Sequence, residues 1–164
     1  MDAFLADPKT LYGDPPEFGP TNFHRNSFAE WQANWALADS IGSTDDGQIR
    51  FVARPYGLFS ISVIFKSLNV ARLDFEDPNV CEANPHWARG LGVAPRVCGP
   101  HFHRWTLNRQ HVLVLGAGIC ELPAREALSP QIRRFEQAFA WLAEQVNVTL
   151  LPEQRLFELP VTLV

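Results

Sequence analysis

Apolar and polar positions alternate along residues 49–75, and this pattern predicts three consecutive β-strands. The segments are IRFVAR, FSISVIFK and NVARLDF, and Pro55 and Gly57 bound the first of them. Successive side chains of a strand point to opposite faces of a sheet. The pattern therefore predicts one apolar face, formed by Ile49, Phe51, Ile61, Val63, Phe65, Leu73 and Phe75.

Two other segments repeat apolar residues at helical spacing. In the first, Ser27 and Glu30 form a capping-box pattern ahead of an apolar stripe, which predicts a helix that ends near Ser40. In the second, Ser129 and Pro130 favour the start of a helix. The stripes consist of Phe28, Trp31, Trp35 and Ala38 in the first helix and of Ile132, Phe135, Phe139, Leu142 and Val146 in the second. We expect both helices to pack on the apolar face of the sheet.

The remaining segments complete an α+β prediction. Residues 1–25 are rich in Pro, Gly and Asp and predict an extended arm. Residues 76–97 show no period and predict a long irregular loop, which in a compact domain is usually functional or disordered. CGPHFHRWTL and HVLVLG predict a hairpin around residues 108–110, and VTLLP and LFELPVTLV a short final strand or arm. The expected fold is a single α+β domain over residues 26–164, with an antiparallel sheet of about five strands and two helices packed on one face.

Composition and charge exclude several classes of protein. The chain has 164 residues and a net charge of −4, which argues against a protein held on duplex DNA by phosphate contacts. We expect no sequence-specific binding to duplex DNA. No run approaches the roughly 18 consecutive apolar residues of a transmembrane helix, so no membrane partner is expected. The N-terminus lacks a basic segment followed by an apolar one, and a cytoplasmic location is therefore expected.

The three cysteines are expected to be free thiols. They are Cys81, Cys98 and Cys120. An odd number without a secretory signal argues against a disulfide framework.

The segment GPHFHRW places two histidines on one strand. Alternation puts His101, His103 and Trp105 on one face and Phe102 and Arg104 on the other. If Phe102 faces the core, both histidines join the polar face of the sheet. The same alternation assigns to that face Arg50, Arg54, Ser60, Ser62, Lys66, Arg72 and Asp74. A plain solvated sheet face is the alternative, since antiparallel sheets commonly have one.

Metal-free acid–base chemistry is the favoured interpretation of these residues. One of His101 and His103 would accept a proton and the other would donate one during cleavage of a phosphate ester. Arg72 would stabilise the charged phosphate, and Asp74 would orient a ring or balance Arg72. RNA or a nucleotide is then the expected substrate, and no cofactor is required.

Two other interpretations of the same face stay open. Zinc is one, because a His-x-His strand offers two imidazoles to one ion. His101 and His103 would then be ligands with His86 as the first candidate for a third, and Asp74 or Cys98 as others. The second is a protein that binds a partner without chemistry, such as an inhibitor or an antitoxin-like protein. Its anchors would be Trp105, Arg50 and Arg54, since Trp and Arg are common at interfaces.

The order of these segments resembles a group of small, uncharacterised bacterial proteins. VARLDF is followed by a loop that contains NPH, by GPHFHRW and by the amphipathic FEQAFAWLAEQVNV. In that group a Leu-Arg-Leu-Asp strand precedes a loop with His and Asn-Pro and a Pro-His-x-His strand. The matching positions are Arg72, Asp74, Asn84, Pro85, His86, His101 and His103, within residues 49–150. The resemblance implies a role in a toxin–antitoxin or phage-defence gene pair. His86 departs from the pattern because it follows Asn-Pro here and precedes it in the group.

Overall fold

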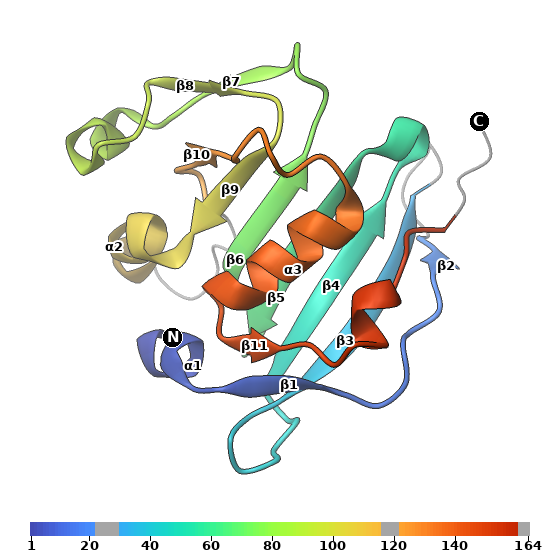
Figure 1. Cartoon of the computed structure of the whole chain (residues 1–164). Helices are drawn as coiled ribbons and strands as arrows, with labels where there is room; N and C mark the ends of the chain where they lie inside the picture. The colour runs from blue at the N-terminus through green and yellow to red at the C-terminus, as the bar shows by residue number, and fades with distance from the viewer. Residues whose placement is uncertain (22–29, 116–121, 161–164) are drawn as a thin grey trace.

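Figure 1 shows a computed structural model of the chain, which describes residues 1–21, 30–115 and 122–160. The strands of the main sheet are β1 (Lys9–Tyr12), β2 (Gly19–Pro20), β3 (Trp31–Ala38), β4 (Gly47–Ala53), β5 (Phe59–Phe65), β6 (Leu68–Phe75), β9 (His101–Arg104), β10 (Glu126–Ala127) and β11 (Val148–Thr149). A separate hairpin is formed by β7 (Cys81–Ala83) and β8 (Arg96–Cys98). The helices are α1 (Asp2–Ala6), α2 (Trp105–Leu115) and α3 (Phe135–Gln145), with short 3-10 turns η1 (Pro55–Gly57), η2 (His86–Leu91) and η3 (Gln154–Leu156).

The main sheet of the described residues has nine strands and is mixed. Its order is β10-β9-β6-β5-β4-β3-β1-β11, and β2 pairs with β3. The β1–β11 pair is parallel and the other pairs are antiparallel. The fold is α+β, but the expected antiparallel sheet of about five strands with two packed helices is wrong. The three strands predicted within residues 49–75 are present as β4, β5 and β6.

The first predicted helix is wrong over its described part, because residues 31–38 form strand β3. Ala33, Trp35 and Leu37 are buried, and Asn34 between them is exposed. This burial repeats every second residue, as a strand requires, and pairing with β1 and β4 satisfies the backbone. The proposed cap at Ser27 lies outside the described residues.

The hairpin predicted around residues 108–110 is also wrong, because helix α2 follows β9 directly. Trp105, Asn108 and Val112 are the buried positions of its described side chains. Their spacing of three and four residues is helical. In Figure 1, α2 lies beside the end of β9, at the edge of the sheet.

Helix α3 covers one face of the sheet, where the main core lies (Figure 1). It begins at Phe135, six residues after the predicted start at Ser129. Its buried residues Phe139 and Leu142 belong to the same core as Trp35 of β3. The ring of Phe139 lies 5.1 Å from that of Phe51 in an edge-to-face contact. The predicted core face of the sheet is present, but α3 alone of the two predicted helices packs on it.

Two predicted irregular segments contain regular structure. Residues 1–20 form α1, β1 and β2 rather than an extended arm, and β1 lies between β3 and β11. Residues 76–97 include η2, β7 and most of β8. Cys81 and Cys98 lie opposite each other in the β7–β8 hairpin and form a disulfide, so the expectation of free thiols is wrong for this pair. Cys120 lies outside the described residues. Among the described helices, none has the length and apolar character needed to cross a membrane.

Candidate metal centre and anion pocket

Strand pairing brings the two histidines to Arg72 and Asp74. His101 of β9 lies opposite Asp74 of β6, and His103 lies opposite Arg72. Phe102, between the histidines, belongs to the core and contacts the ring of Trp141 in α3. The two imidazoles therefore leave the sheet on the face opposite α3.

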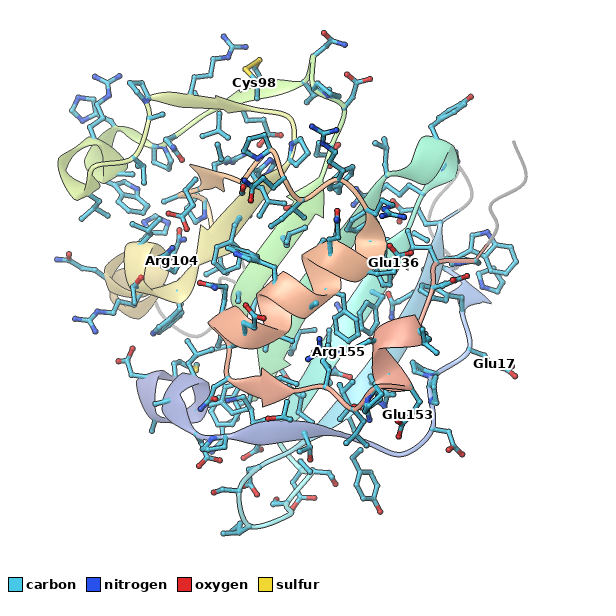
Figure 2. All side chains as sticks on the ribbon, in the orientation of Figure 1. Glu17, Cys98, Arg104, Glu136, Glu153 and Arg155 are labelled. Atoms are coloured by element: carbon cyan, nitrogen blue, oxygen red, sulfur yellow. A yellow bond between two sulfur atoms is a disulfide. The ribbon has the colours of Figure 1, made fainter. Side chains whose placement is uncertain are left out.

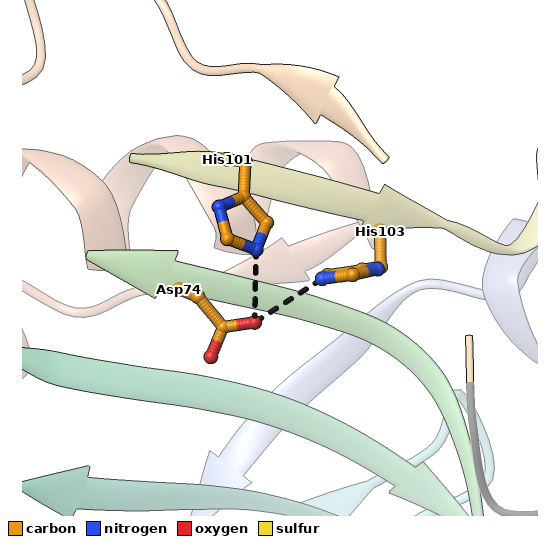
Figure 3. Close-up of side chains that lie close together, drawn as sticks. All are labelled: Asp74, His101 and His103. Atoms are coloured by element: carbon orange, nitrogen blue, oxygen red, sulfur yellow. Dashed lines mark ion pairs between the residues drawn. The ribbon is translucent and has the colours of Figure 1, made fainter. Parts of the chain in front are cut away.

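The Asp74 carboxylate is the point on which both imidazoles converge (Figure 3). Oδ2 of Asp74 lies 3.2 Å from Nε2 of His103 and 3.6 Å from Nε2 of His101. The two rings are 4.9 Å apart and nearly perpendicular. Asp74, His101 and His103 are only 2%, 6% and 5% exposed, so they do not lie on an open solvated face.

The other carboxylate oxygen of Asp74 is held by neighbouring side chains. Oδ1 accepts hydrogen bonds from Oγ of Ser60 at 2.7 Å and from Nε and Nη2 of Arg72 at 3.0 and 2.8 Å. Burial by itself would raise the pKa of Asp74. The hydrogen bond from His103, the charge of Arg72 and the hydrogen bond from Ser60 outweigh it and hold the pKa well below its usual range. Asp74 is therefore an ionised group with Oδ2 directed at the histidines.

A backbone carbonyl sets the proton position of His101. Nδ1 lies 2.8 Å from the carbonyl oxygen of Gly99, which can only accept, so Nδ1 carries the proton. Burial lowers the pKa of His101, although the hydrogen bond to Gly99 acts in the opposite direction. The lowered pKa favours the neutral ring. In that form Nε2 presents a lone pair toward Asp74. A lone pair beside a carboxylate oxygen is a place where a cation is stabilised.

His103 is held on one side only. Its Nε2 is within hydrogen-bond distance of Asp74, whereas its Nδ1 is buried and has no hydrogen-bond partner among the described residues. In the absence of a metal, Nε2 carries the proton and donates a hydrogen bond to Oδ2 of Asp74. Nδ1 is then an unpaired acceptor.

A pocket of about 250 Å³ lies over these groups. It is lined by Arg72, Asp74, Glu76, Glu82, His101, His103, Leu122, Pro123 and Arg125. Glu82 comes from β7, so part of the loop predicted over residues 76–97 does line the same pocket as the histidines. Residues 122–125 form another wall, from a segment just before β10. Figure 2 shows Cys98 at the outer edge of the molecule, on the hairpin that carries Glu82.

The structure does not bring the other candidate residues to the pocket. His86 is exposed in η2, and Cys98 is bonded to Cys81. Trp105 is 3% exposed and packs in a small second core, so it cannot anchor a partner as an exposed side chain. Arg54 is engaged by Glu30, Glu76 and Ser60.

Arg50 lies on the polar face but outside the pocket. Its Nε donates to Oδ1 of Asn34 on the neighbouring strand. The pairing register places Arg50 opposite Ser62, Ser62 opposite Arg72, and Arg72 opposite His103. Arg50 is thus two strands away from Arg72, in the same row of the sheet.

Sequence reasoning missed the residues that close the pocket and hold its histidines. Arg125 and Glu82 contribute charges, and Gly99 sets the proton position of His101. Arg125 lies in LPAREAL, which shows no period and no motif. Cys81, within the unpatterned loop, and Cys98, directly after it, were an available signal that this loop has a defined position.

Asp74, His101 and His103 form a group that could hold a metal ion. One ligand atom from each residue lies within 4.8 Å of the other two. Two imidazoles and one carboxylate form a donor set found in catalytic zinc sites and in other first-row transition-metal sites. The neighbouring Arg72 and Arg125 offer guanidinium groups that can bind an anion.

Comparison with known proteins identifies no relative of this chain, so a proposal about its function depends on the pocket residues described above. No protein-family model matches the chain, and neither the curated proteins nor the solved structures searched contain a significant match.

Proposed function

We propose that the pocket binds a divalent transition-metal ion through Asp74, His101 and His103 and hydrolyses a phosphate-bearing substrate, RNA or a nucleotide. The observation that carries the proposal is the convergence of two imidazole nitrogens and one carboxylate oxygen, from three buried residues that line one pocket. A buried carboxylate with one oxygen saturated and the other facing two nitrogens is suited to a cation. Zn²⁺ is the first candidate from this donor set.

The spacing of the donor atoms supports this ion. Zinc bonds of roughly 2.0–2.1 Å in a tetrahedral site separate neighbouring ligand atoms by about 3.3–3.4 Å. The two distances to Oδ2 of Asp74, 3.2 and 3.6 Å, lie on either side of that value. The hydrogen bond from Nδ1 of His101 to Gly99 is the kind of contact that orients a metal-binding histidine. Three protein ligands also leave a coordination position for a substrate or water, as catalytic zinc sites do.

The charges around the group favour a phosphate-bearing substrate. A metal ion would polarise a phosphoryl oxygen and lower the pKa of water. Arg72 and Arg125 provide planar guanidinium groups, which pair with phosphate oxygens through two parallel hydrogen bonds. Glu76 forms an ion pair with Arg54, whose Nη1 lies 3.2 Å from Oε1 of Glu76, and this offsets part of the repulsion between Glu76 and a phosphate.

Metal-free acid–base catalysis is the second candidate, and the unpaired Nδ1 of His103 favours it. A metal at Nε2 would move the proton to Nδ1, where the described residues supply no acceptor. Leaving a buried donor unpaired costs about 1–3 kcal/mol. In the metal-free form, Nε2 of His101 is the general base, with Arg72 stabilising the phosphate.

The proposal also includes where the protein acts and in which biological role. A cytoplasmic location and a role in a toxin–antitoxin or phage-defence pair are expectations that rest on the sequence alone. The Cys81–Cys98 disulfide weighs against a permanently reducing compartment, because disulfides persist mainly in oxidising ones. The non-enzymatic alternative loses its central anchor, since Trp105 is buried and donates from Nε1 to Asp2.

Metal analysis and activity assays test the two candidates together. Protein purified without a histidine tag is analysed for bound metal after exposure to Zn²⁺, Co²⁺ or Mn²⁺. It is then assayed on RNA oligonucleotides and nucleotides, with and without a chelator. His101→Ala is compared with His86→Ala, because His86 is an exposed histidine away from the pocket.

The metal proposal expects about one equivalent of metal in the wild type and in His86→Ala, and loss of metal and activity in His101→Ala. Activity that survives the chelator but requires His101 would support the metal-free candidate. A wild type that binds no metal and cleaves neither substrate would overturn both.

A further inference from the structure

We infer that Arg125 binds the anionic group of the substrate and that Asn84 and Asn108 position it for that role. The inference rests on the proposed function, because it names the residue that recognises the phosphate ester in the same pocket. Arg125 belongs to an irregular segment, so its place depends on contacts with residues far away in the chain.

Two buried asparagines hold the backbone on both sides of the peptide bond between Ala124 and Arg125. Nδ2 of Asn108 donates to the carbonyl of Ala124 at 2.9 Å, and its Oδ1 accepts from the amide of Ala124 at 2.8 Å. Nδ2 of Asn84 donates to the carbonyl of Arg125 at 2.8 Å, and its Oδ1 accepts from the amide of Arg125 at 2.8 Å. Each side chain thus pairs with one residue as a neighbouring strand would.

The two asparagines that make these contacts are themselves buried, and each also bonds to a second part of the chain. Asn108 of α2 is fully buried, and its Nδ2 also reaches the carbonyl of Arg104, the last residue of β9. Asn84 is 6% exposed, and its Nδ2 also reaches the carbonyl of Ala94, before β8. The position of Arg125 is therefore determined from two sides, by α2 and by the disulfide-bonded hairpin.

The Arg125 side chain is placed to act on an anion in the pocket. It lines the pocket with Asp74 and Arg72, and burial lowers its pKa while the charge of Asp74 raises it. Its side chain is 12% exposed, and its ion-pair partner is Glu82. The Glu82 side chain is 54% exposed on β7, so it is a solvated partner for a largely buried guanidinium.

A phosphate group can replace Glu82 on Arg125. Exposed carboxylates contribute little to the stability of an ion pair, because water solvates the free carboxylate well. A phosphate ester carries one or two charges and accepts two parallel hydrogen bonds from one guanidinium. Substrate binding would thus exchange a weak partner for a stronger one, and Glu82 would compete with the substrate.

Inorganic phosphate is the probe for this inference. Its affinity is measured by calorimetry for the metal-loaded and the metal-free protein, in the wild type, Arg125→Gln, Glu82→Gln and Asn84→Ala. Arg104→Gln is the matched control, since Arg104 forms a comparable ion pair with Glu126 but does not line the pocket. Metal affinity and the unfolding midpoint are measured for every variant.

We expect Arg125→Gln to weaken phosphate binding on the order of 10- to 100-fold, the loss typical of one charged hydrogen-bonding group. Glu82→Gln should strengthen binding, and Arg104→Gln should leave it unchanged. Asn84→Ala should weaken binding at temperatures where the variant is fully folded, without changing metal affinity. Combining Asn84→Ala with Arg125→Gln should add little further loss, because both changes remove the same contact.

Two results would overturn the inference. One is an equal phosphate affinity in the wild type and Arg125→Gln, and the other is no phosphate binding to the wild type in either metal state. Failure of the proposed metal site is a separate outcome, recognised by a wild type that takes up no metal. Phosphate binding to that metal-free protein still decides the role of Arg125.

Discussion

His103 donates from Nε2 to Oδ2 of Asp74 across 3.2 Å, while its Nδ1 is buried without a hydrogen-bond partner among the described residues. The same carboxylate accepts three hydrogen bonds from Ser60 and Arg72 at Oδ1. Asp74 is thus the group that joins β5, β6 and β9 on the polar side of the sheet. Its charge matters for folding as well as for any ligand.

We expect Asp74→Asn to destabilise the metal-free protein by about 1–3 kcal/mol at neutral pH, because the amide replaces a charged acceptor. The folded pKa of Asp74 lies below the unfolded value of about 3.9. Its stabilising contribution is therefore complete above that value and is lost as the pH falls toward the folded pKa. Urea unfolding at several pH values below 5 should show a weaker pH dependence in Asp74→Asn. Equal pH dependence in the two proteins would contradict this.

The disulfide is expected to stabilise the fold and the pocket wall. Cys81 and Cys98 are 17 residues apart, and closing a loop of about that length contributes about 3 kcal/mol. Cys81→Ser/Cys98→Ser should therefore unfold at lower denaturant concentration than the wild type, and a reductant should lower the wild type to the same value. Cys120→Ser serves as the control and should keep the full response to the reductant. A wild type that is insensitive to complete reduction would show that the bond contributes nothing.

Lys9 should make stability depend on pH in the alkaline range. Its side chain is buried and donates to the carbonyls of Phe4 and Asp7, and burial lowers its pKa to about 8. The unfolded chain binds the proton up to about pH 10.5, so the unfolded state holds more protons between these values. Stability should therefore rise by about 2 kcal/mol from pH 8 to pH 10.

Lys9→Met provides the comparison, because it keeps an unbranched side chain of similar length and removes the titrating group. The difference in unfolding free energy between wild type and Lys9→Met is measured across pH 7–10. This difference should shift in favour of the wild type as the pH increases. A constant difference would mean that Lys9 keeps an ordinary pKa in the folded protein.

Trp105 should behave as a core residue. It packs with Val112 and Leu122 in the second core, and Nε1 donates to Asp2 at 3.0 Å. We expect Trp105→Ala to cost about 3–5 kcal/mol of stability, as large-to-small changes of buried aromatic residues do. Trp87→Ala is the comparison, because Trp87 is 39% exposed and its ring stacks on that of His111 at the surface. Thermal or urea unfolding of the two variants measures this difference, and similar small losses in both would contradict it.

Part of the site could be predicted from the sequence because alternation along a strand is a local property. The pattern of residues 49–75 identified β4, β5 and β6 and the polar row that contains Arg72 and Asp74. The same rule, with Phe102 in the core, assigned His101 and His103 to that row. What alternation did not show is that these side chains are buried, since the cover comes from residues 122–125 and from β7.

The sequence by itself determined the elements whose burial follows one clear period: the three central strands and the stripe of α3. It was ambiguous for residues 31–38, where Trp31, Trp35 and Ala38 fit a helix and Ala33, Trp35 and Leu37 fit a strand. Tertiary structure decided that case, because a strand there pairs with both β1 and β4. It also decided the parallel β1–β11 pair, the disulfide and the position of Arg125. The physical reason is that each of these depends on contacts between residues far apart in the chain, which no local period records.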